Sequence, residues 1–130
     1  MKKKAIVYLL ISNEEFRQKI KAQIATGKEL ESRQISSQQA LENSNKEVSI
    51  WLKNNEELFK QSFNDPDNEY VEYYYRYDVG RFFIGRHNLS TEIEKNKHKI
   101  SHNLTGLAKV LEYIDSIPTK EKLLSLGFKV

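Results

Sequence analysis

Arg81 and His87 are the two side chains of this sequence best suited to acid–base chemistry on a phosphate ester. A histidine titrates near neutrality, so it can move a proton to or from a reacting group. An arginine can hold the scissile phosphate through paired donors and stabilise the charge that develops there. Gly80 and Gly85 disfavour a continuous helix through the pair. The alternative is a solvated arginine beside a capping or surface histidine, and we favour it.

His98 and His102 form a second candidate site, because residues four apart on a helix lie one turn apart, as metal ligands do. Lys95, Lys97 and Lys99 surround the pair and would repel a cation. The zinc-protease pattern with a glutamate between the histidines is absent, and the chain has no cysteine. The sequence therefore predicts no metal site, and nothing in it points to a cofactor.

A basic face follows from the same part of the chain. Lys95, His98, Lys99 and His102 recur at i, i+3, i+4 and i+7, so on a helix they share one side. Such a face can follow a phosphate backbone. The alternative is an ordinary solvated helix face, which we favour.

Residues 70–86 have the most unusual composition of the chain, with five tyrosines, two phenylalanines and three arginines. Aromatic rings beside arginines can stack on nucleobases, and the same residue types are enriched at the centres of protein–protein interfaces. Consecutive tyrosines must point in different directions, so at least one of Tyr73–Tyr75 is expected at the surface. A partner or self-association surface and plain packing carry equal weight here. The predicted partner-binding residues are Tyr70, Tyr73, Tyr74, Tyr77, Phe82 and Phe83.

The composition indicates one folded domain over residues 1–130. The sequence is 38% hydrophobic and 30% charged, which is enough apolar material for a core and excludes a wholly disordered chain. A net charge of +3 permits nucleic-acid binding without implying it. The absence of cysteine excludes a disulfide framework and thiolate chemistry.

The N-terminal segment imitates a signal peptide, with three lysines before the apolar residues 5–11. The apolar run is only seven residues long and no small-residue cleavage pattern follows it. It is far too short to span a bilayer. We expect a buried first turn or strand, a cytoplasmic location and no membrane partner.

Helix start and stop signals divide the chain into three long helices and one or two short ones. Capping boxes at Ser12, Ser36 and Thr91 predict the starts of the long helices, and Pro118 predicts the end of the third. Asp65–Pro66 predicts the start of a short helix. Residues 5–11 could extend the first helix backwards, and residues 78–88 have no clear assignment. Thr119–Leu126 could form a last helix ended by Gly127 in the left-handed conformation. The predicted fold is an all-α antiparallel bundle.

Three groups of residues resemble a helical region that often precedes TIR-like nucleotide-binding effector domains in bacterial phage-defence proteins. They are Gly27-Lys28-Glu29-Leu30, then Trp51-x3-Asn55-x2-Leu58-Phe59-x3-Phe63, then Val110-Leu111-x2-Ile114 before a proline. The resemblance implies a scaffold, sensor or oligomerisation module, either standing alone or as one part of a two-protein system. It carries no catalytic residue over to this sequence.

The Arg81-x5-His87 spacing in an all-helical domain of this size is similar to the motif of HEPN ribonucleases. Phe82 departs from that family, in which a polar residue commonly follows the arginine. Two hypotheses therefore stand. The first is a non-enzymatic helical interaction module that forms a homo-oligomer or binds a companion protein. The second is a HEPN-like RNA-binding protein or ribonuclease that uses Arg81 and His87.

Overall fold

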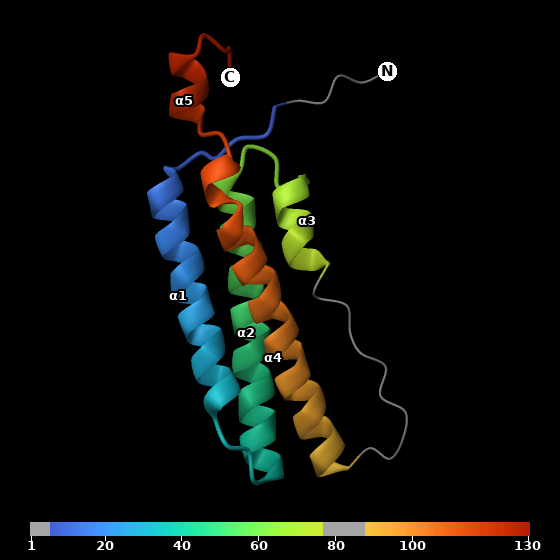
Figure 1. Cartoon of the computed structure of the whole chain (residues 1–130). Helices are drawn as coiled ribbons and strands as arrows, with labels where there is room; N and C mark the ends of the chain where they lie inside the picture. Colours follow the sequence, from blue (N-terminus) through green and yellow to red (C-terminus); the bar gives the residue numbers. More distant parts are fainter. Residues whose placement is uncertain (1–5, 77–87) are drawn as a thin grey trace, which may run out of the picture.

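A computed structural model describes residues 6–76 and 88–130, and these residues form an all-α bundle, which confirms the predicted fold class (Figure 1). The long helices of the described chain are α1 (Asn13–Ser32), α2 (Gln38–Ser62) and α4 (Leu89–Glu112). Its short elements are α3 (Glu69–Tyr75), the 3-10 helix η1 (Ile114–Ser116) and α5 (Lys120–Ser125).

The long helices do not simply alternate in direction. α1 runs antiparallel to α2 and α4, whereas α2 and α4 run the same way because the chain turns back along α3 between them (Figure 1). Side-chain contacts show the same arrangement. The Asn13 amide at the start of α1 donates to the Ile114 carbonyl just beyond the end of α4, at 2.9 Å. The Asn96 amide near the start of α4 donates to Ser44 Oγ near the start of α2, at 3.1 Å.

The core is built from apolar residues that recur at helical spacing along the long helices. Phe16 of α1 packs edge-on against Phe59 and Phe63 at the end of α2, with ring centroids 6.3 and 5.5 Å apart. Edge-to-face contacts of this kind add to the stabilisation that aromatic burial provides. The α4 stripe also faces inward, and its members Ile100 and Leu107 are fully buried.

The N-terminal residues 6–11 form an extended segment, not a backward extension of α1. Leu9 is completely buried and pairs with Phe63 on one side and Thr119 on the other. Its N–H donates to the Pro118 carbonyl at 2.8 Å, and its carbonyl accepts from the Lys120 N–H at 2.9 Å. On the other side the Leu10 N–H donates to the Ser62 carbonyl at 2.8 Å. The segment therefore joins the end of α2 to the start of α5.

Two long helices start at residues other than those predicted. α2 is capped by Ser37, whose side chain accepts from the Ala40 N–H, and not by Ser36. α4 is capped by Asn88, which accepts from the Thr91 N–H, so Thr91 lies inside the helix. Ser12 caps α1 as predicted. Ser36 and Ser37 are adjacent and of equal capping ability, whereas Asn88 precedes Thr91 by three residues and is the better N-cap of the two.

The short helix α3 also begins later than predicted. Asp65 is not its cap. The Asp65 carboxylate accepts from the Asp67 N–H in a turn, and the Asn68 side chain caps α3 by accepting from the Val71 N–H. A start at residue 69 turns Val71 and Tyr74 together into the core, where they are 4% and 1% exposed.

Helix α5 ends as the sequence predicts. Gly127 has a φ of 89°, a conformation that glycine adopts without steric cost. The Gly127 N–H donates to the Leu124 carbonyl and the Phe128 N–H to the Leu123 carbonyl, at 3.1 and 2.9 Å. These two bonds are those of a Schellman motif. α5 stands above the bundle, beside the N-terminal segment (Figure 1).

Gly106 allows α3 to approach α4 closely. A Cβ atom at this position would lie 2.6 Å from the Tyr74 carbonyl oxygen and 3.1 Å from the Tyr74 Cα. These are backbone atoms, so only a displacement of α3 could relieve the overlap. The contact therefore sets the distance between α3 and α4.

We expect Gly106→Ala to destabilise the fold. An overpacking cost of about 1–3 kcal/mol opposes a helix-propensity gain of about 1 kcal/mol, so the expected net loss is about 1 kcal/mol in urea unfolding. Ser101→Ala, at an exposed position of the same helix, is the control and should be neutral or stabilising. A Gly106→Ala protein at least as stable as the parent would contradict the close contact.

Candidate functional site

The predicted catalytic pair and half of the predicted partner-binding residues lie outside the described part of the chain. These residues are Tyr77, Arg81, Phe82, Phe83 and His87. The basic face and the tyrosines of α3 are described, and so is one further surface that the sequence analysis did not single out.

The basic face predicted on α4 is only partly free for a ligand. Lys99 is exposed, whereas Lys95 forms an ion pair with Glu92 at 3.2 Å. The imidazoles of His98 and His102 are half-buried and lie against each other, with ring centroids 3.8 Å apart. Of the four side chains, Lys99 presents its charge most openly.

Lys97 lies between the predicted basic residues, and its side chain binds the C-terminal end of α1. Its ammonium donates to the carbonyls of Glu31 and Leu30 at 2.8 and 3.2 Å, and to the Arg33 carbonyl. These carbonyls end α1, where the last four carbonyls of a helix lack intrahelical partners. Burial and then Arg33 lower the pKa of Lys97, while Glu31 acts in the opposite direction. This lysine therefore caps a helix and offers no charge to a phosphate.

Tyr74 belongs to the core and not to a surface. It is 1% exposed, and its hydroxyl accepts from the Asn55 amide at 3.3 Å. Asn55 in turn accepts from the Gln23 amide at 2.8 Å, and the Gln23 carbonyl accepts from the Trp51 indole at 2.9 Å. This buried network joins α1, α2 and α3, so the role of Tyr74 is in packing.

Two other tyrosines of α3 are half-buried. The Tyr70 ring stacks on Phe63 with centroids 6.3 Å apart, and its hydroxyl donates to the Ser116 carbonyl at 3.5 Å. Burial, followed by the nearby Glu69, raises the pKa of Tyr70. Tyr73 stacks on Tyr113 with centroids 4.6 Å apart.

Tyr75 is the member of the Tyr73–Tyr75 run that reaches the surface, at 42% exposure, as the sequence requires of at least one of them. The Arg76 guanidinium lies 5.4 Å from the centre of the Tyr73 ring. We name Tyr73, Arg76 and Tyr113 the tyrosine face, because their side chains contact one another. It carries the residue types that dominate protein interfaces.

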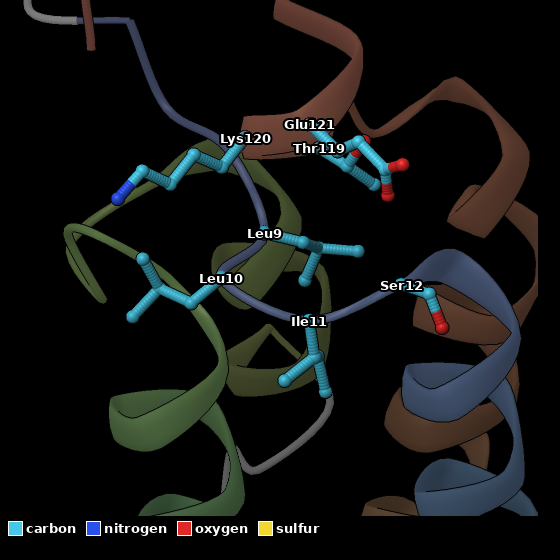
Figure 2. Close-up of a pocket in the computed structure, with 7 residues that line it drawn as sticks. All are labelled: Leu9, Leu10, Ile11, Ser12, Thr119, Lys120 and Glu121. Carbon is cyan, nitrogen blue, oxygen red and sulfur yellow. The ribbon is translucent and has the colours of Figure 1, made fainter. Parts of the chain in front are cut away.

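A more exposed apolar surface lies at the end of the bundle that carries α5. Residues of the N-terminal segment and of α5 form it: Ile6, Leu10, Leu124, Leu126 and Phe128, which are 43, 48, 51, 64 and 45% exposed. We name these five residues the end surface. Figure 2 shows Leu10 and Lys120 on one side of the segment and Leu9 directed to the other. This surface was not predicted from the sequence. Ile6 and Leu10 belong to the apolar run 5–11, which was expected to be buried.

A pocket of about 80 Å³ lies where the N-terminal segment meets the start of α5 (Figure 2). Pockets for cofactors and drug-sized ligands occupy about 300–1,000 Å³. This pocket is therefore too small for such a ligand. Its position nevertheless shows that the segment and α5 meet imperfectly.

No protein-family model, curated protein or solved structure matches this chain. Within residues 6–76 and 88–130, no helix is long and apolar enough to cross a membrane. In the same ranges, no three side chains of metal-ligating type come close enough together to hold an ion. The tyrosine face and the end surface are therefore the features that bear on function.

We expect Lys97→Met to destabilise the protein by about 1–3 kcal/mol, because the carbonyls that end α1 lose a charged donor. Lys99→Met is the matched control, since Lys99 is exposed two residues away and should change stability by less than about 0.5 kcal/mol. Urea unfolding of both variants checks the difference. Equal effects would show that Lys97 does not hold the end of α1.

We expect Tyr74→Phe to cost about 1–3 kcal/mol of stability, because the ring is kept while the buried Asn55 amide loses its acceptor. Tyr75→Phe, at the exposed neighbouring position, should be close to neutral. The comparison is made by thermal or urea unfolding. A neutral Tyr74→Phe variant would contradict the proposed network.

Proposed function

We propose that this chain is a non-enzymatic helical module that binds another protein chain, either a second copy or a companion. The end surface carries this proposal. Five of the large hydrophobic side chains exposed in the described part of the chain belong to this end of the bundle, while Ile50 and Tyr75 lie elsewhere. Groups of exposed apolar side chains mark candidate sites of protein interaction.

The tyrosine face supports the same class of function. Tyrosine and arginine supply large contact areas with few rotatable bonds, which makes them effective at interfaces. The resemblance to the helical region of TIR-like phage-defence proteins also points to a scaffold, sensor or oligomerisation role in a bacterial defence system. A companion protein would in that case supply the enzymatic activity.

The described residues give no support of their own to the HEPN-like alternative. Lys97 is committed to the end of α1, and Lys95 pairs with Glu92. Of the predicted basic face itself, Lys95 is paired, and the neighbouring Lys97 adds no charge to that face.

Incubation with an end-labelled RNA tests the choice between the two functions. We expect the RNA to stay intact and unbound at moderate salt, read by gel and by fluorescence anisotropy together. Cleavage that disappears in both Arg81→Ala and His87→Ala would overturn the proposal and make the protein a ribonuclease.

Photo-crosslinking in the cells that express the protein tests the interaction directly. Benzoylphenylalanine at position 126, in the end surface, should give discrete protein adducts, and the same residue at position 50 should give none. Ile50 is the control because it is equally exposed, at 59%, but is apart from the end surface. The adducts should fade when Leu10→Lys is added. Equal labelling at both positions, or none at position 126, would contradict the proposed function.

A further inference from the structure

The N-terminal segment, which carries Ile6 and Leu10 of the end surface, lies in the middle of a three-part strip, and the other members of the end surface lie on its α5 flank. Residues 8–10 bond to residues 118–120 on one side and to residues 62–64 on the other, where the Asn64 N–H donates to the Tyr8 carbonyl at 3.1 Å. The order across this end of the molecule is therefore α5, the N-terminal segment, and the turn from α2 into α3. Each flank of the strip carries its own charge.

The α5 flank is basic and the opposite flank is acidic. Exposed Lys120, Lys122 and Lys129 outnumber Glu121 on the first flank. The turn and the start of α3 expose four acidic side chains, and no lysine or arginine occurs between residues 60 and 76. The acidic residues are Asp65, Asp67, Glu69 and Glu72. Among the described residues, no ion pair joins these acidic side chains to the lysines of α5.

The middle of the strip is apolar on both faces. Side chains of an extended segment alternate between faces, so Val7, Leu9 and Ile11 turn toward the core. Ile6 and Leu10 turn outward and are 43% and 48% exposed. A strand that is apolar on both faces is typical of one covered on both. Here the core of the same chain covers the inner face, and among the described residues Ile6 and Leu10 are left exposed on the outer face.

We propose that a second copy of this chain covers the strip in an isologous dimer. A two-fold axis through the outer face of residues 6–10 places the basic flank of each copy on the acidic flank of the other. It also places the apolar middle of one copy on that of the other. A surface that is basic, apolar and acidic in sequence is thus complementary to itself under a two-fold rotation. The proposal rests on the proposed function, because it names the partner for the same surface.

The charges of the two flanks also disfavour other binding partners for the strip. An anionic membrane would attract α5 but would be repelled by the four acidic side chains on the other flank. A uniformly charged partner would meet the same conflict. A matching partner must carry an acidic region opposite the basic flank and a basic region opposite the acidic flank. A second copy of this chain carries both.

Sedimentation velocity of the full chain tests the dimer. We expect a concentration-dependent dimer of twice 15.3 kDa for the parent, and a dissociation constant raised about tenfold or more by Leu10→Lys or Leu126→Lys. Ile50→Lys is the control and should leave the dimer intact. Circular dichroism verifies that each variant is folded. A folded parent that stays monomeric at about 100 µM, or Leu10→Lys and Leu126→Lys variants that dimerise like the parent, would overturn the dimer.

A mixing experiment tests the two-fold arrangement. One variant carries Lys120→Glu and Lys122→Glu, and the other carries Asp65→Lys, Asp67→Lys and Glu69→Lys, which makes the acidic flank basic although Glu72 is kept. Each alone should be monomeric, because its flanks then repel their counterparts. The mixture should form heterodimers, because both pairs of flanks are again opposite in charge. Variants that each dimerise alone, or a mixture that stays monomeric, would overturn this arrangement.

The proposed function can be judged separately from this dimer. Crosslinked adducts at position 126 with the mass of a different protein would overturn the dimer and keep the interaction module. Loss of all adducts, or RNA cleavage, would overturn the module itself.

Discussion

The backbone hydrogen bonds of residues 8–10 decide how the α5 end of this bundle is built. An extended segment cannot satisfy its own N–H and C=O groups, so it requires backbone partners on both sides. Here those partners are Ser62 and Asn64 on one side and Pro118 and Lys120 on the other. They stand at the end of α2 and at the start of α5, which are far apart in the sequence. The place of α5, and therefore of the basic flank, depends on these bonds.

Polar side chains within the bundle fix how the helices align along their axes. Apolar stripes set which faces meet, but they tolerate sliding more readily than directional bonds do. Asn55 links α2 to Gln23 of α1 and to Tyr74 of α3, and Lys97 of α4 holds the end of α1. Asn96 joins the starts of α2 and α4, so these bonds also fit the shared direction of those two helices.

The sequence allowed the fold class, the long helices and most of their inward faces to be predicted, because apolar residues at helical spacing report burial directly. The helix starts were less predictable where capping residues are neighbours. Ser36 and Ser37 cap equally well, so the sequence could not tell which of the two starts α2. The Asp65–Pro66 pattern marks a turn, and α3 begins later because the Asn68 side chain caps it. The spacing of apolar residues did not indicate that α4 runs parallel to α2.

The sequence predicted the residue types of the candidate surfaces better than it predicted which individual residues are exposed. Three consecutive tyrosines have no periodicity of their own, so the sequence could not tell buried Tyr74 from exposed Tyr75. In the sequence, Lys97 cannot be told from Lys95 and Lys99. Only the fold shows that its ammonium contacts the end of α1.

The apolar run 5–11 is the most informative case, because the same residues explain both a success and a failure. Its uniform apolarity correctly indicated that Leu9 is buried, but an extended chain presents its side chains to two faces. The bundle covers the face with Leu9, while Ile6 and Leu10 are exposed on the other face. These two exposed side chains lie between a basic helix and an acidic turn, and they are the basis of the interface proposed for this end of the bundle.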